Sequence, residues 1–286
     1  MNQKATSNTP VKTPSTASVL VLGSGTSHGV PMIGCGCATC RSDDPRDTRS
    51  RASILITVHG EASILIDTSP DLRAQALQHG LRRVDAILYT HSHADHVLGL
   101  DDVRRFNSLQ RQPIPCYGDL RTLTDLRRTF AYAFEDTAHQ GGGIPRVVLF
   151  PLAGEFSIGA AAFTPVPVMH GSRVIYGYRV GNFAYLTDCS AIPETSWPLL
   201  EGVEVVILDA LRDRPHPTHL SIAESLQIVE RLAPERAFFT HMCHDLPHVA
   251  TCARLPEGVE LAYDGLAFEI SLRNGANPSG LGGPRE

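Results

Sequence analysis

Short runs of apolar residues recur along the chain, and most are nearly continuous in Val, Ile, Leu and Phe instead of alternating with polar residues. Such runs predict β-strands that are covered on both faces. A further run, Phe163–Met169, is interrupted by proline. The other predicted strands are Ser18–Leu22, Ser53–Val58, Ser63–Asp67, Ala86–Thr90, Val147–Phe150, Val174–Val180, Phe183–Thr187, Val205–Asp209 and Ala237–Thr240.

Helices are predicted between these strands. The sequence Ser69-Pro70-Asp71 predicts a helix with Ser69 as its N-cap and proline at its first position, ending near Gly80. Ser221 and Glu224 have the spacing of a capping box, which predicts the start of a second helix. Strands covered on both faces and interleaved with helices predict an α/β fold, in which two β-sheets lie between outer helices as an αββα sandwich.

The two ends of the chain differ in composition from its middle. Residues 1–17 are rich in Ser, Thr and Pro, and we expect them to form a disordered arm. Residues 273–286 are dominated by Asn, Gly and Pro and are expected to be a flexible tail. The sequence therefore predicts a single domain over residues 18–272.

The overall composition is typical of a water-soluble globular protein. Of the 286 residues, 42% are hydrophobic and 19% are charged, and the formal net charge is −5. This charge does not favour a nucleic-acid partner, although it leaves a local basic patch open. The longest apolar runs are far shorter than the roughly 20 residues of a membrane span. The N-terminus lacks the apolar core of a signal peptide. We therefore expect a cytoplasmic protein without membrane contact.

Polar residues with metal-binding side chains follow several of the predicted strands. A buried strand that ends in such a residue places it at a sheet edge, where loops can build a site. One strand that ends in such a residue is ordinary, but six of them indicate that these strand ends lie together along one edge of the fold. The six residues are Asp67, His91, His170, Asp188, Asp209 and His241.

The sharpest motif is His91-Ser92-His93-Ala94-Asp95-His96, which follows a predicted strand. Neutral imidazole and carboxylate are the usual ligands of zinc and related divalent ions. Four candidate ligands in six residues cannot all reach one ion. On a strand-to-helix turn, the first two histidines can bind one metal while Asp95 and His96 bind its neighbour. A solvated histidine-rich loop is the alternative interpretation.

This motif, in this position, resembles the metallo-β-lactamase superfamily. The resemblance implies that His91, His93 and His170 hold one metal, and that Asp95, His96 and His241 hold a second. It also implies that Asp188 bridges both ions, and that Asp67 orients ligands instead of binding metal. Two adjacent metals activate a water molecule and stabilise an in-line displacement at phosphorus, so no nucleophilic side chain is required.

A second group of candidate ligands lies nearer the N-terminus. Cys35, Cys37 and Cys40 offer three thiolates, and one more ligand would complete a tetrahedral zinc site. His244 is the best candidate because it lies three residues beyond His241. Three buried thiols or a redox motif remain the alternative. The module resembles that of the phosphoribosyl cyclic phosphodiesterases, and also that of PqqB. In the phosphodiesterases a histidine in the position of His244 is the fourth ligand, which implies a structural zinc here.

The resemblance also indicates catalytic and substrate-binding residues. It implies that His219, just before the capped helix, protonates the leaving group or stabilises the phosphate. His216 is the competing candidate for this role. Asp95 is expected to act in catalysis as well as in metal binding. Arg105 and Arg173 are candidates for contact with a substrate phosphate.

The leading functional hypothesis is a phosphodiesterase that hydrolyses small cyclic phosphodiesters, such as phosphoribosyl 1,2-cyclic phosphate or 2′,3′-cyclic nucleotides. The expected cofactors are two zinc or manganese ions at the active site and one structural zinc. Three alternatives remain open: a tRNA 3′-processing endoribonuclease, a PqqB-like biosynthetic or binding protein, and a thioester or lactone hydrolase. Relatives are commonly dimeric, so a homodimer is expected.

Overall fold

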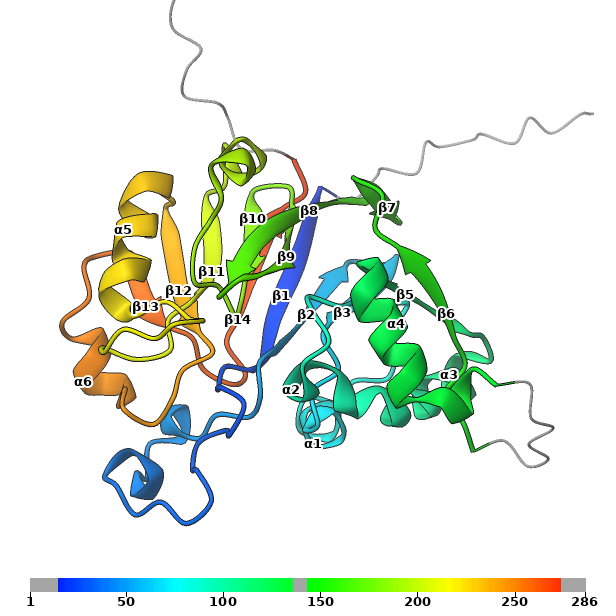
Figure 1. The fold of residues 1–286 in the computed structure, drawn as a ribbon, viewed down its shortest axis with the longest axis horizontal. Helices are drawn as coiled ribbons and strands as arrows, with labels where there is room; N and C mark the ends of the chain where they lie inside the picture. The colour runs from blue at the N-terminus through cyan, green and yellow to red at the C-terminus, as the bar shows by residue number, and fades with distance from the viewer. Residues whose placement is uncertain (1–14, 136–142, 274–286) are drawn as a thin grey trace, which may run out of the picture.

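The computed structural model describes residues 15–135 and 143–273. The predicted C-terminal tail lies outside these residues except for its first position, as does most of the predicted N-terminal arm. Two β-sheets pack face to face, and helices cover their outer faces (Figure 1). No helix in the described ranges is long and apolar enough to span a membrane.

The first sheet has the strand order β14-β1-β2-β3-β4-β5-β6. Neighbouring strands are antiparallel from β14 to β3 and parallel from β3 to β6. Its strands are β1 (Thr16–Gly23), β2 (Ser53–Val58), β3 (Ala62–Ile66), β4 (Ala86–Leu88), β5 (Ile114–Gly118), β6 (Val147–Pro151) and β14 (Ala267–Ser271).

The second sheet has the order β13-β12-β11-β10-β9-β8-β7. Here the strands from β10 to β13 are parallel, and those from β7 to β10 are antiparallel. They are β7 (Phe156–Ile158), β8 (Ala161–His170), β9 (Arg173–Val180), β10 (Phe183–Leu186), β11 (Val205–Asp209), β12 (Arg236–Thr240) and β13 (Val259–Leu261).

The helices fall into two sets, one beside each sheet (Figure 1). Beside the first sheet lie α1 (Leu72–Gln78), α2 (Ala94–Val97), α3 (Arg104–Gln110) and α4 (Leu120–Thr129). Beside the second lie α5 (Ile222–Leu232) and α6 (His248–Cys252). The 3-10 turns are η1 (Thr39–Arg41), η2 (Pro45–Asp47), η3 (Leu98–Val103), η4 (Ala131–Ala133) and η5 (Glu194–Leu200).

Three apolar layers hold these elements together. The inner faces of the two sheets share one core, with Ile54 from the first sheet and Phe163 from the second. A second core lies between the first sheet and its helices, and it includes Phe106 of α3. The third packs α5 and neighbouring segments against the second sheet around Phe239. Because both faces of each sheet are covered, the predicted αββα sandwich is confirmed.

The predicted strands and helices agree with the structure except at some of their ends, whereas strands β5, β7, β13 and β14 were not predicted. The capping box of α5 is confirmed, since the Ser221 hydroxyl and the Glu224 carboxylate each accept from the other residue's backbone N–H. The predicted start of α1 is wrong by two residues. Its first residue is Leu72, because the Ser69 hydroxyl accepts from Asp71 N–H and forms a turn before the helix. Strand β1 begins at Thr16, two residues before the predicted domain start.

Candidate active site

Strands of both sheets end at one rim of the sandwich. Strands β3 and β4 are parallel, and so are β10, β11 and β12, so the residues that follow them lie at the same edge of their sheets. Of the six strand-end residues, three have a left-handed backbone, with φ of 63° at Asp67, 55° at Asp188 and 59° at His241. Residues other than glycine rarely adopt this backbone conformation, because it costs free energy. Where they do, the residues are often at functional sites.

The structure brings together all seven side chains that were proposed as ligands of two metals. They form two groups, and within each group the candidate ligand atoms lie within 4.8 Å of one another. One group is His91, His93 and His170, and the other is Asp95, His96, Asp188 and His241.

Asp188 faces both groups. One of its carboxylate oxygens lies 3.1 Å from His96 Nε2, and the other lies 3.3 Å from His241 Nε2. The latter oxygen is also 3.9 Å from His91 Nε2, in the first group. Asp95 lies within the second group, with its Oδ2 3.3 Å from His96 Nε2 and 3.5 Å from His241 Nε2. The placement of Asp188, which faces both groups, is what a carboxylate that bridges two ions requires.

Hydrogen bonds fix the orientation of the imidazoles in the cluster. His96 Nδ1–H donates to Asp67 Oδ2 at 2.7 Å, and the Thr90 hydroxyl donates to the same oxygen at 2.8 Å. His91 Nδ1 contacts that hydroxyl at 3.0 Å. Asp67 therefore orients His96 directly and His91 through Thr90, and both Nε2 atoms face the cluster.

His170 is held in a similar way. His170 Nδ1–H donates to the carbonyl of Thr218 at 2.8 Å. The Nε2 atoms of His91 and His96 are buried, and no group among the described residues forms a hydrogen bond with either of them. Because an unpaired buried nitrogen is costly, these atoms fit ligands of a metal ion.

The histidines of the cluster differ in the direction in which their pKa is shifted. Burial lowers the pKa of His91, His93 and His170, so these imidazoles are neutral near pH 7, which is the form that binds metal. Burial also opposes protonation of His96 and His241. At these two residues the surrounding carboxylates, Asp188 above all, outweigh it and raise the pKa. Because a metal binds the neutral imidazole, a proton competes with the metal at these two residues.

We expect Asp67→Asn to weaken binding of divalent ions by about 10- to 100-fold. The amide would place an N–H group where a carboxylate oxygen now accepts from His96 or Thr90. Competition with a chelator measures the affinity. Asp85→Asn, which changes a carboxylate paired with Arg83, is the control. Equal metal affinity in both variants would limit Asp67 to a role in folding.

Asp209 is a site residue whose role the sequence did not indicate. It is fully buried and ends β11. Its carboxylate accepts from Asp188 N–H at 3.1 Å, from Leu220 N–H at 2.9 Å and from His219 Nδ1–H at 3.2 Å. Asp209 thus positions both Asp188 and His219. Its position at the end of a predicted strand indicated that Asp209 lies near the site, but that position did not distinguish a positioning residue from a metal ligand.

The two histidines proposed as the acid occupy different places. The ring of His219 stacks on that of His241 at 4.7 Å and lies 4.8 Å from that of His170. With Nδ1 held by Asp209, its Nε2 is left for a substrate. His216 is farther out, with its ring 5.2 Å from that of His219 and its Nδ1 accepting from Thr218.

The two candidate arginines are also placed differently. Arg173 begins β9 and is paired in register with His170, one of the clustered histidines. Arg105 lines a separate cavity of about 460 Å³ between α1 and α3, together with Leu72, Arg73 and Phe106. None of the clustered histidines lines that cavity. The structure therefore brings Arg173, but not Arg105, to the candidate metal centre.

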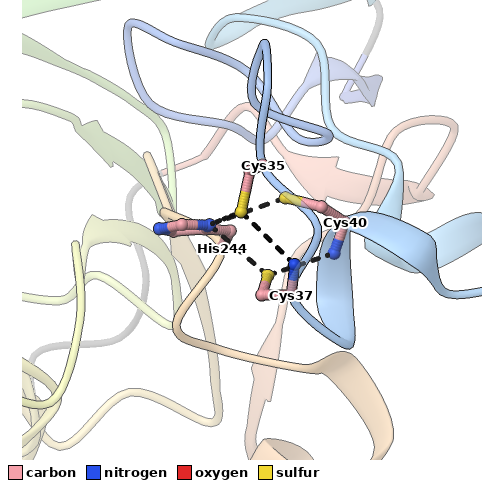
Figure 2. Close-up of side chains that lie close together, drawn as sticks. All are labelled: Cys35, Cys37, Cys40 and His244. Carbon is pink, nitrogen blue, oxygen red and sulfur yellow. Dashed lines mark hydrogen bonds between the residues drawn. The ribbon is translucent and has the colours of Figure 1, made fainter.

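The cysteine module forms a second, compact site (Figure 2). The Sγ atoms of Cys35, Cys37 and Cys40 lie 3.2, 3.5 and 3.5 Å from His244 Nδ1. In a tetrahedral zinc site, bonds of about 2.3 Å to sulfur and about 2.1 Å to nitrogen separate these atoms by about 3.6 Å. The backbone N–H of Cys40 lowers the pKa of the Cys37 thiol to about 6, which favours a thiolate. The four residues fit zinc.

We expect Cys37→Ser to contain one zinc ion fewer per chain than the unchanged protein, because three ligands do not close a tetrahedral site. Metal analysis after dialysis measures this difference. Cys252→Ser, which alters a cysteine outside the module, should keep the full complement. Equal zinc content in the two variants would contradict a thiolate site.

Backbone hydrogen bonds join the segment after β1, residues 24–26, to the loop that carries His241 and His244. Thr26 N–H donates to Met242 O at 3.0 Å, and Met242 N–H donates to Ser24 O at 3.1 Å. A Cβ at Gly25 would lie 2.8 Å from the carbonyl oxygen of Arg49, so the close packing of residue 25 against residue 49 requires glycine. The two candidate metal sites therefore share one supporting structure.

Comparison with known proteins identifies relatives of this chain. Residues 62–242 match the model of the Beta-lactamase superfamily domain. A diphosphatase from the PhnP family is 46% identical, with a TM-score of 0.84, over 90% of this chain and 98% of that one. The zinc-bound PqqB from Methylobacterium extorquens is 20% identical, with a TM-score of 0.70, over 88% of this chain and all of that one, which shows a shared fold alone.

An octanoyltransferase from Porphyromonas gingivalis is 34% identical over 249 residues, which are 86% of this chain. The chain spans 50% of the length of that protein, so the transferase activity in its name does not carry over. The superfamily match covers more than half of the chain, and the chain covers nearly all of the diphosphatase. The chain therefore belongs to the metallo-β-lactamase superfamily, within its PhnP family, and is a metal-dependent hydrolase.

Proposed function

We propose that this protein hydrolyses small phosphodiesters, including cyclic ones, at a centre of two divalent ions. The observation that carries this proposal is the cluster of seven candidate ligands around Asp188, with His219 at its edge. When bound, two such ions lower the pKa of water and stabilise charge on phosphoryl oxygens. The histidines and carboxylates suit zinc or manganese, whereas the thiolate module suits zinc.

The residues around the centre orient the substrate and move one proton. Arg173, paired in register with His170, is placed to contact a phosphoryl oxygen. Water adds to phosphorus and releases one proton to the solvent, from which His219 later regains a proton, and the bond from phosphorus to the leaving oxygen breaks. His219 Nε2–H donates its proton to that oxygen, while Asp209 holds Nδ1–H and so orients the ring for this transfer. The products are a phosphomonoester and an alcohol, which for a cyclic substrate remain in one molecule.

The relative described as a diphosphatase favours a second substrate class, the diesters of diphosphate. The same attack on phosphorus cleaves a phosphoanhydride, and the leaving oxygen then belongs to a phosphate. That leaving group is a weaker base than a sugar alkoxide and depends less on His219.

Assays on a panel of substrates test the proposal, with manganese or zinc restored to the purified protein. We expect turnover of bis-p-nitrophenyl phosphate and of 2′,3′-cyclic AMP, and include ADP-ribose as a diphosphate diester. A precursor tRNA, an acyl thioester and a lactone cover the alternative hydrolases. Turnover of one of these three but of no small diester would overturn the proposal. Turnover of none would favour a biosynthetic or binding role of the PqqB kind.

A further inference from the structure

A cavity of about 460 Å³ lies between α1 and α3, beside the first sheet (Figure 1). Neither His219 nor Arg173 lines it, and nor do the seven candidate metal ligands. We propose that this cavity binds a second small molecule, an alkyl phosphate in which an aliphatic chain carries one phosphate group. The site goes beyond the proposed phosphodiesterase activity and does not depend on the substrate of the metal centre.

The apolar part of the cavity suits an aliphatic chain. Leu77 of α1 is 67% exposed and Leu109 of α3 is 41% exposed, and both line the cavity. The other aliphatic lining residues are Leu72, Ala76 and Leu81. A ligand that covers the exposed leucines gains free energy from the apolar surface it buries. Phe106, the aromatic residue that lines the cavity, is 4% exposed, so its ring offers no open face on which a nucleotide base could stack.

The charged part of the cavity has more arginines than carboxylates. Four arginines line it, and Asp102 is the only carboxylate among the described lining residues. Arg104 is paired with Asp101 at 2.9 Å. Among the described residues, no carboxylate lies within ion-pair distance of the other three, which are Arg73, Arg82 and Arg105. Even if Asp102 offsets one of these three charges, two positive charges remain.

A phosphate monoester complements this excess charge. It carries a charge of about −1.5 to −2 near pH 7 and has three acceptor oxygens, which guanidinium N–H groups can bind in pairs. Arg73 belongs to α1 and Arg105 to α3, and both are exposed. A phosphate between the helices can therefore accept hydrogen bonds from both of them. Arg105, which the sequence indicated as a phosphate ligand, would then bind the phosphate of a different molecule from the substrate.

The dimensions of the cavity favour a small molecule over a protein segment. Small-molecule sites typically have volumes of about 300–1,000 Å³, and this cavity lies within that range. Helices α1 and α3 have seven residues each, which is about 10 Å of helix. A partner helix of three turns is about 16 Å long and would extend beyond both of them.

Calorimetric titration with hexyl phosphate tests the site, using the full chain with manganese restored. We expect inorganic phosphate, which lacks the chain, to bind at least about 10-fold more weakly, as for the loss of two or more buried methylene groups. Hexanol, which lacks the charge, should also bind at least about 10-fold more weakly, as for the loss of one charge-assisted hydrogen bond. Hexanoate carries a single charge and should bind less tightly than hexyl phosphate.

Two variants each alter one part of the cavity. Arg105→Gln removes a charge and Leu109→Ser removes apolar surface, and we expect each to weaken binding of hexyl phosphate by about 10-fold. Both side chains are exposed, so neither change should prevent folding. Arg121→Gln is the matched control, because Arg121 is an exposed arginine of α4 outside the cavity. It should bind hexyl phosphate as the unchanged protein does.

Four results would overturn the site. The first is equal binding of hexyl phosphate by the unchanged protein and Arg105→Gln. The second is a loss of binding in Arg173→Gln in place of Arg105→Gln, which would assign the ligand to the metal centre. The third is equal affinity for inorganic phosphate and hexyl phosphate. The fourth is binding to vesicles of phosphatidic acid without binding of hexyl phosphate in solution, which would indicate a membrane contact. None of these results bears on hydrolysis of the small phosphodiesters, so the proposed function is tested separately.

Discussion

Replacing His219 with alanine should slow hydrolysis of 2′,3′-cyclic AMP by about 10²- to 10⁴-fold, the usual contribution of a general acid. The sugar oxygen leaves as a strongly basic alkoxide unless it receives a proton. His219 is placed to supply that proton because Asp209 holds its Nδ1, and its ring stacks on His241 at the edge of the cluster. Measurement of kcat at saturating substrate and metal tests this prediction.

The leaving group distinguishes proton donation from a structural role. The p-nitrophenolate ion is stable without a proton, so His219→Ala should reduce hydrolysis of bis-p-nitrophenyl phosphate much less. His216→Ala is the matched control, since that ring lies 5.2 Å from His219 and its Nδ1 is already occupied by Thr218. We expect His216→Ala to keep kcat for 2′,3′-cyclic AMP within a few-fold.

Two outcomes would contradict this assignment. An equal loss on both substrates would indicate that His219 holds the centre together instead of donating a proton, and the metal content of the variant would then be reduced. A greater loss in His216→Ala than in His219→Ala, on 2′,3′-cyclic AMP, would transfer the role of the acid to His216.

The position of the candidate centre could be predicted from the sequence because its residues follow apolar strands. A strand such as Val205–Asp209 is identified by its continuous apolar run, and the structure assigns the same bounds to β11. The residue after such a strand lies at the rim, whatever the details of the neighbouring loops. This is why His170, Asp188 and His241, far apart in the sequence, could be grouped before the structure was known.

Other features depend on contacts that a single sequence does not show. Strand β5 was missed because Pro115 and Gly118 disfavour a strand locally, yet its pairing with β4 and β6 overrides that preference. Asp209 looked like a possible metal ligand, but its carboxylate accepts hydrogen bonds from two backbone N–H groups and from the His219 ring. Only the fold brings these partners next to Asp209. Arg105 was expected near the substrate, but the direction of α3 places it in another cavity.

Arg49 illustrates the same limit, because nothing in the sequence distinguishes it from the less buried arginines around it, Arg46 and Arg51. Its side chain is fully buried, and Nη1–H donates to the carbonyl of Cys243 at 3.0 Å. Nη2–H donates to the carbonyl of Leu246 and to Asp47 Oδ1. Arg49 thus clamps the loop that follows His241 and carries His244. Asp47 also accepts from His248 N–H at 2.8 Å, so this buried pair joins three segments of the chain.

We therefore expect Arg49→Met to lower the free energy of unfolding by about 3–5 kcal/mol, as for other buried ion pairs that lose one partner. The methionine would leave the buried Asp47 carboxylate without its counter-charge and would remove the donors to three carbonyls, those of Arg46, Cys243 and Leu246. Urea unfolding at saturating metal, followed by the fluorescence of the single tryptophan, measures the change. Arg46→Met removes an arginine whose side chain is 42% exposed and pairs with Asp44, so it should cost no more than about 1 kcal/mol. Similar small losses in both variants would show that the Arg49 clamp does not stabilise the loop that holds the two candidate metal sites together.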